Sequence, residues 1–128
     1  MFSKAERSSF KYWFAHWCAF NMTALNLKVW RFKYLFHDAE KPWLKLLFKD
    51  YKKVQKFHRE HNRHHFEYKG KREYDYMAMV IDWECSHLTK ESCPARAREK
   101  TMEYIETKPQ HKEMLETKII PILNKLNL

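Results

Sequence analysis

Residues 36–42 read Phe36-His37-Asp38-Ala39-Glu40-Lys41-Pro42 and follow a run of aromatic residues. The adjacent His37 and Asp38 place a neutral imidazole beside a carboxylate, and both are ligand types that suit a divalent metal. Pro42 fits the first turn of a following helix. The pair gains weight from further ligand types along the chain, which are His16 upstream, His58, His61, His64 and His65 downstream, and Asp82 beyond them.

The composition predicts one all-α domain. A chain of 128 residues fits a single domain, and an aromatic content of 16% predicts a core built from large rings. The single glycine, Gly70, excludes Gly-rich phosphate loops and dinucleotide-binding motifs, and the scarcity of turn signals argues against sandwiches and barrels. We expect a compact bundle of about six helices over residues 1–128, with a core at 10–90 and C-terminal helices at 94–126.

Hydrophobic periodicity predicts where the helices lie. Apolar positions recur nearly all round over residues 10–27, which predicts a mostly buried helix. Further helices are expected over 28–36, from Pro42 to Phe48, from Tyr51 to about Tyr68, from Tyr74 to His87, from Ser92 to Glu106, and from Gln110 to Leu126 with an interruption or kink near Pro121. The expected core includes Trp13, Trp17 and Phe20, whereas Glu84 is expected to face solvent.

Charge and cysteine usage indicate the partners and the compartment. Lys and Arg outnumber Asp and Glu by 25 to 16, a formal net charge of +9. Such a surface favours anionic partners, nucleotides or nucleic acid among them, or serves only solubility. Three cysteines without a Cys-x-x-Cys spacing predict free thiols and a cytoplasmic protein, with Cys18 as a small buried hydrophobe. Neither a signal peptide nor a membrane span is expected.

Three candidate ligands occupy positions that periodicity would bury. Burial of His16, His37 or Asp82 is costly unless the side chain is paired, hydrogen-bonded or bound to a metal. Each histidine alone can be a hydrogen-bonded core residue, and Asp82 alone can be the partner of a Lys or Arg. Together with Asp38 they offer metal-ligand types from separate helical segments, which is how helix bundles build metal sites.

The histidine cluster lies on one predicted helix. His58, His61 and His65 are three and four residues apart, so they share one face, and His64 lies beside it. This face either points inward to the candidate metal ligands or is a solvated basic face among the neighbouring lysines and arginines.

The ordered residues resemble the HD-domain metal-dependent phosphohydrolases. Members carry a His on an early helix, a His-Asp pair often extended as His-Asp-x-x-Lys-Pro, and an Asp on a late helix. The matching residues here are His16, His37-Asp38 with Lys41-Pro42, and Asp82. The chain is also similar to an uncharacterised family of small bacterial and phage proteins with a His-Asp-x-x-Lys segment and a later His-x-x-x-Asn-x-His-His segment, here His58, Asn62, His64 and His65.

The resemblance, which covers about residues 10–90, implies both a fold and a reaction. It implies an HD-like helical domain that holds one or two divalent ions, drawn from Mn, Fe, Ni, Co, Mg and Zn. A metal-activated water would cleave a nucleotide-like phosphate ester. The implied metal ligands are His16, His37, Asp38 and Asp82, with His64 and His65 available for a second ion.

The same resemblance implies catalytic roles for Asp38, Lys41, His58 and His65. Asp38 can bridge two ions, and Lys41 would stabilise the negative charge that builds up on the phosphate. His58 and His65 would bind a second metal or the substrate phosphate. The Gly-Tyr-Pro signature of the cyclic-dinucleotide hydrolases is absent after His65, which argues against that substrate class.

Two other functions stay open at this point. Some relatives with the same ligand pattern use a di-iron centre for oxygenation, so the pattern alone does not fix the reaction. The basic composition also fits a non-catalytic helical module that binds nucleic acid or anionic nucleotides. Affinity of such a module would fall steeply with salt and would not respond to a chelator.

Overall fold

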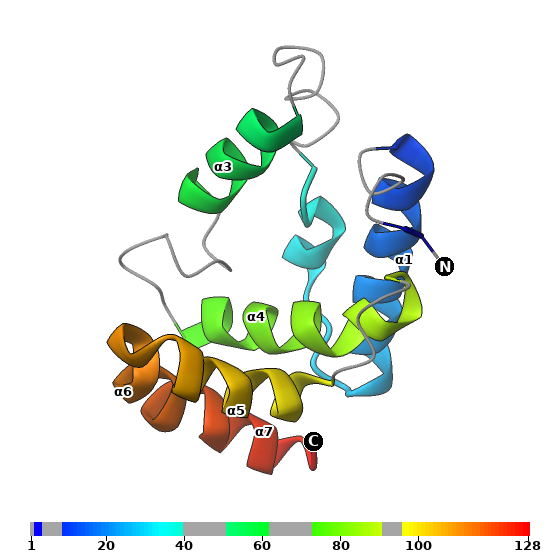
Figure 1. Ribbon diagram of the computed structural model, residues 1–128. Coiled ribbons are helices and arrows are strands. Elements are labelled where there is room, and N and C mark those ends of the chain that lie inside the picture. The colour runs from blue at the N-terminus through cyan, green and yellow to red at the C-terminus, as the bar shows by residue number, and fades with distance from the viewer. Residues whose placement is uncertain (1, 4–8, 40–50, 62–72, 91–95) are drawn as a thin grey trace.

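The computed structural model describes residues 2–3, 9–39, 51–61, 73–90 and 96–128 (Figure 1). Within these ranges the chain is helical and contains no β-strand beyond an isolated parallel bridge between Phe2 and Lys90. The prediction of an all-α class is therefore confirmed. None of the described helices combines the length and the apolar character that crossing a membrane requires.

Helix α1 (Phe10–Asn26) begins where the sequence predicts and is capped by Ser9, whose Oγ accepts a hydrogen bond from the amide of Tyr12 at 3.1 Å. After α1 ends, Lys28 takes a left-handed φ of 61°. The prediction of a helix over 28–36 is wrong for the first half of this segment. Only its second half is helical, as the 3-10 helix η2 (Phe32–Phe36). Side-chain bonds from α1 hold this segment and override its helical periodicity.

The remaining helices follow in chain order. They are α3 (Tyr51–His61), α4 (Glu73–Cys85) with the 3-10 turn η3 (Ser86–Leu88), α5 (Ala97–Thr107), the 3-10 turn η4 (Pro109–His111), α6 (Lys112–Met114), the π-helix η5 (Leu115–Ile119) and α7 (Ile120–Lys125). The predicted helix from Pro42 to Phe48 and the part of the predicted helix beyond His61 lie outside the described residues.

The interruption predicted for the last helix near Pro121 is observed as a division into α6, the π-helix η5 and α7. Pro121 explains the break, because it has no N–H to donate to the carbonyl of Thr117, four residues earlier. The backbone widens into the π-helix η5 immediately before this proline. Leu115 and Ile119 on η5 remain fully buried, so the irregular turn still faces the core.

Helix α4 lies between α1 and the C-terminal helices (Figure 1), and its side chains belong to two hydrophobic clusters. One cluster joins α4 to α1 and η2 through Ala19, Phe20, Ala24, Tyr34, Ala78, Ile81 and Cys85. The other joins α4 to the C-terminal helices through Met79, Val80, Trp83, Ala97, Leu115, Ile119 and Leu123. Both sides of α4 are therefore covered. Packing against the C-terminal helices holds α4 in place, and this fixes the side chains that α4 presents to α1.

The prediction that Glu84 faces solvent is wrong, because only 4% of this residue is exposed. Its Oε2 accepts a hydrogen bond from the amide of Ala97 at 3.1 Å, and its Oε1 forms an ion pair with the guanidinium of Arg96. The first amides of a helix lack partners within the helix. Glu84 on α4 supplies the acceptor for one of these amides. The periodicity of α4 does not predict the burial of Glu84, because α5 covers this side of the helix.

Glu84→Ala is expected to lower the free energy of unfolding by about 2 kcal/mol, because it leaves the buried Ala97 amide without its acceptor and removes a cap from α5. Urea denaturation followed by circular dichroism measures the change. Glu103→Ala on the exposed side of α5 is the matched control and should change stability by less than about 0.5 kcal/mol. Equal stability of the two variants would contradict the capping role.

Candidate metal centre

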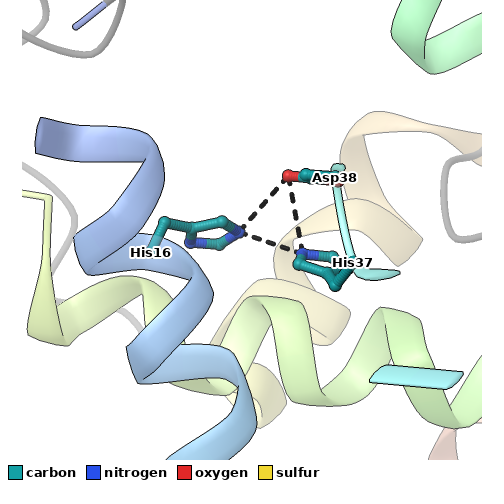
Figure 2. A group of neighbouring side chains, drawn as sticks. All are labelled: His16, His37 and Asp38. Carbon is teal, nitrogen blue, oxygen red and sulfur yellow. Dashed lines mark hydrogen bonds and ion pairs between the residues drawn. The ribbon is translucent and has the colours of Figure 1, made fainter. Parts of the chain in front are cut away.

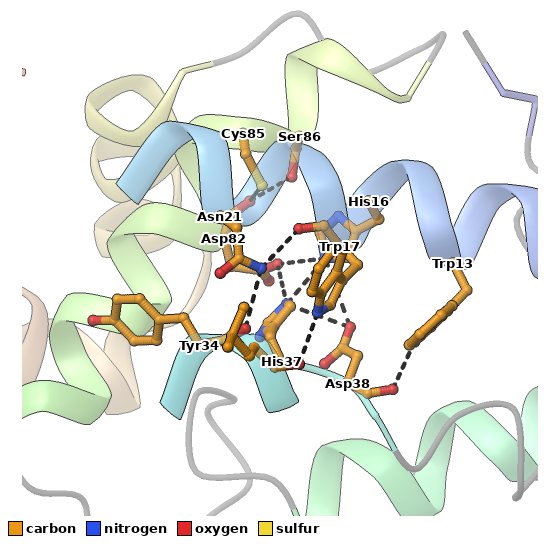
Figure 3. Close-up of polar contacts among 11 residues, drawn as sticks. Trp13, His16, Trp17, Asn21, Tyr34, His37, Asp38, Asp82, Cys85 and Ser86 are labelled. Carbon is orange, nitrogen blue, oxygen red and sulfur yellow. Dashed lines mark hydrogen bonds and ion pairs between the residues drawn. The ribbon is translucent and has the colours of Figure 1, made fainter. Parts of the chain in front are cut away.

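Four side chains from three segments converge between α1 and α4. His16 comes from α1, His37 and Asp38 come from the turn after η2, and Asp82 comes from α4. Figure 2 shows His16, His37 and Asp38 with two ring nitrogens and one carboxylate oxygen directed toward a common point. Figure 3 adds Asp82, which approaches the same nitrogens from α4.

The distances between these atoms fit the ligand shell of one ion. His16 Nε2 lies 2.9 Å from Asp82 Oδ1, 3.1 Å from His37 Nε2 and 3.6 Å from Asp38 Oδ2. His37 Nε2 lies 3.5 Å from the same oxygen of Asp38 and 3.5 Å from the same oxygen of Asp82. Ligand atoms bound at ~2.0–2.2 Å to one cation lie about 2.8–3.6 Å apart in octahedral or tetrahedral geometry. The donor set therefore fits a small divalent ion.

Burial makes a cation favourable at this point. The side chains of His16, His37 and Asp38 are 6%, 4% and 3% exposed, and that of Asp82 is 16% exposed. Two ionised carboxylates beside the same pair of imidazoles in an apolar core are costly without a compensating positive charge. A divalent cation would balance both carboxylates. Asp82, the most exposed of the four, marks the side on which solvent comes nearest.

The His37-Asp38 pair directly follows the last helical residue of η2, Phe36, as the sequence predicts, and forms a type II β-turn. His37 has φ −59° and ψ 124°, Asp38 has φ 55°, and the Ala39 amide bonds to the Phe36 carbonyl at 3.1 Å. The third position of this turn requires a positive φ, which usually selects glycine. Asp tolerates this conformation better than most residues. The strain persists because the surrounding contacts fix the turn.

Polar side chains on one stripe of α1 fix that turn. Trp13 Nε1 donates to the Asp38 carbonyl at 2.7 Å, and Trp17 Nε1 donates to the Leu35 carbonyl at 2.8 Å. Asn21 Nδ2 donates to the Tyr34 carbonyl at 3.1 Å (Figure 3). The sequence predicts both tryptophans in the core, whereas in the structure they are half-buried and their Nε1 groups donate hydrogen bonds. Their spacing with Asn21, four residues apart along α1, is the signal that could have revealed the stripe.

Aromatic rings orient the two imidazoles. The ring of Phe20 stacks on that of His37 with centroids 3.7 Å apart and an interplanar angle of 9°. The ring of Tyr12 stacks on that of His16 with centroids 5.9 Å apart and an angle of 16°. Phe20 is fully buried, so the prediction of Phe20 as a core residue is confirmed. Its packing limits the rotation of His37 away from the common point.

Cys85 is a fifth potential ligand, which the sequence motifs do not predict. A ring nitrogen of His16, a carboxylate oxygen of Asp82 and Cys85 Sγ all lie within 4.8 Å of one another. Burial raises the pKa of the Cys85 thiol well above its usual value, and the neighbouring Asp82 carboxylate raises this pKa further. The signal for Cys85 was its position three residues after Asp82, on the same side of α4.

Lys41, His64 and His65 lie outside the described residues. Helix α3 includes His58 and His61, but the description does not extend to their side chains. Their implied roles toward a second ion or a substrate phosphate therefore stay predictions.

Comparisons of the chain with models of known protein families, with curated proteins and with solved structures found no match. Likeness to the HD-domain superfamily therefore remains a prediction from the sequence motifs. The buried His/Asp cluster, through its geometry and chemistry, is the feature of the structure that bears on function.

Proposed function

We propose that this protein is a metal-dependent phosphohydrolase of the HD-domain type that acts on a nucleotide-like phosphate ester. The observation that supports the proposal is the convergence of His16, His37, Asp38 and Asp82, whose ligand atoms lie 2.9–3.6 Å apart in the measured pairs. The order of these residues along the chain matches the motif order of that superfamily. Two free thiols, Cys18 and Cys85, accord with the proposed cytoplasmic location.

The chain's own residues would divide the work as follows. His16 and His37 would each present an unprotonated Nε2 to the ion, and Asp38 and Asp82 would balance its charge. The ion, when bound, would supply an activated water near neutral pH and would polarise a phosphoryl oxygen. Asp82 borders the more exposed side of the cluster, so a phosphate ester would approach over this carboxylate. The aromatic rings behind both histidines would exclude water from the far side.

Removal of metal should abolish phosphate-ester cleavage. We expect divalent metal in the purified protein by elemental analysis, and a loss of at least about 100-fold in bis-p-nitrophenyl phosphate hydrolysis after dialysis against EDTA. Activity should return on addition of Mn²⁺, Co²⁺ or Zn²⁺ to the dialysed protein. A folded protein that binds none of these ions after reconstitution would refute the proposal.

A second candidate function is supported by helix α3. Lys52, Lys53 and Lys56 are all exposed on this helix, and its first turn contains no acidic residue. Together with the formal charge of +9, this basic face would suit a module that binds nucleic acid without catalysis. A salt titration of oligonucleotide binding, with and without EDTA, separates the two functions. The binding module is favoured if the protein lacks hydrolase activity and if its oligonucleotide affinity falls steeply with salt but does not change with EDTA.

A further inference from the structure

We propose that Cys85 provides a sulfur ligand to the metal centre, so that the centre takes a thiophilic divalent ion such as Zn²⁺ or Co²⁺ in preference to Mg²⁺ or Mn²⁺. The inference rests on the metal centre of the proposed function and specifies which class of ion occupies it. It concerns a residue that the His-Asp motif pattern does not include.

The sulfur of Cys85 is close to two of the candidate metal ligands. Cys85 Sγ lies within 4.8 Å of both a His16 ring nitrogen and an Asp82 carboxylate oxygen. Around one zinc ion, with Zn–S of about 2.3 Å and Zn–N of ~2.0–2.1 Å, sulfur and nitrogen ligands lie about 3.5 Å apart. The separation therefore has to shorten by at most about 1.3 Å, which a small change in the side-chain torsions of Asp82 and Cys85 can supply.

The second step is that the thiol hydrogen bond is easily replaced. Cys85 Sγ donates to the Asp82 backbone carbonyl at 3.3 Å, and Ser86 Oγ donates to the same carbonyl at 2.8 Å. Since S–H is a weak donor, the carbonyl keeps its stronger partner when the thiol leaves (Figure 3). Ligation would break the S–H bond, form a sulfur–metal bond and release the proton to solvent.

The third step concerns His16. Its Nδ1 is buried and has no hydrogen-bond partner within the described part of the chain. A histidine that binds a metal through one nitrogen usually donates from the other to a fixed acceptor. Without such an acceptor the ring of His16 is oriented by its stacking on Tyr12, which permits a small adjustment toward Cys85. His16 can thus join a ligand set that contains both Asp82 and Cys85.

Ligand softness then selects the ion. A set that combines imidazole nitrogens, carboxylate oxygens and a thiolate is typical of zinc and cobalt, whereas Mg²⁺ and Mn²⁺ prefer oxygen ligands. Cys85 is fully buried between α1 and α4. The sulfur would therefore bind the ion from the interior of the protein.

The test compares the wild-type protein with Cys85→Ser and Cys85→Ala by titration with Co²⁺, Zn²⁺ and Mn²⁺. Cys18→Ser is the matched control, since Cys18 is a half-buried free thiol of α1 outside the cluster. Wild type and Cys18→Ser should show a near-ultraviolet thiolate-to-cobalt charge-transfer band. Both Cys85 variants should lack this band and should lose about 10–100-fold in Zn²⁺ affinity, with Mn²⁺ affinity changed less than about 3-fold.

The outcomes separate this inference from the proposed function. A charge-transfer band that persists in a folded Cys85 variant, or an unchanged Zn²⁺ affinity, would overturn sulfur ligation. If that variant still hydrolysed phosphate esters in an EDTA-sensitive way, the proposed function would stand without the sulfur ligand. A wild-type protein that bound none of the three ions would overturn both.

Discussion

Asp38→Asn is expected to weaken divalent-metal binding by at least about 100-fold, because even the loss of a residue that only orients a ligand costs 10–100-fold. The substitution replaces a charged ligand oxygen with a neutral amide oxygen. Asp38 Oδ2 lies 3.5 Å from His37 Nε2 and 3.6 Å from His16 Nε2, so the change is made inside the ligand cluster. Isothermal titration calorimetry with Mn²⁺ and Zn²⁺ measures the loss, and phosphate-ester hydrolysis should fall in parallel.

The fold should survive this substitution. Asn tolerates the left-handed conformation of position 38 about as well as Asp. The backbone carbonyl at this position can still accept the bond from Trp13. Glu84→Gln is the matched control, since it neutralises another buried carboxylate on the far side of α4, and it should leave metal affinity within about 3-fold of wild type. Wild-type affinity in a folded Asp38→Asn protein would remove Asp38 from the ligand set.

Phe20→Ala is expected to lower the free energy of unfolding by about 3–5 kcal/mol, the usual range for removal of a buried ring. Phe20 is fully buried in the cluster that joins α1, η2 and α4. Its removal leaves a cavity directly behind His37. Chemical denaturation measures the loss. Phe32→Ala makes the same change at a ring that is 69% exposed, and it should cost less than about 1 kcal/mol.

A milder change separates stability from ligand positioning. Phe20→Leu keeps most of the apolar volume but removes the flat ring that stacks on His37 at 3.7 Å. We expect the protein to fold and to bind metal about 10-fold more weakly, as for the loss of other groups that orient a ligand. If Phe20→Leu bound metal like the wild type, Phe20 would serve stability alone.

The long periodic helices could be predicted from the sequence, and the connections between them could not. Helix α1 begins at the predicted Phe10 and ends within one residue of the predicted Leu27, because apolar residues and a serine cap both mark it. The segment after it was predicted as helix, since nothing in the sequence announced the left-handed Lys28. Bonds that join residues 25 and 18 positions apart, such as those from Trp13 and Trp17, decide that segment.

The candidate site shows the same division. The sequence predicts His16, His37, Asp38 and Asp82 as ligands, because the types and the order of these residues match a metal-binding pattern, and the structure brings them together. Cys85 was overlooked, because a lone cysteine reads as a small hydrophobe until its neighbours are known. Glu84 was misplaced for a related reason, since a helix covered on both sides has no polar face to assign.

The positive φ of Asp38 restricts how the chemistry of this centre can be altered. A longer donor such as Glu would cost about 1 kcal/mol or more in backbone strain at this position, whether or not an ion is bound. Exchange of the donor type is therefore easier at His16 and Asp82, which lie on regular helices. Redesign of the ion preference is best directed to those two helical positions, with the turn left as it is.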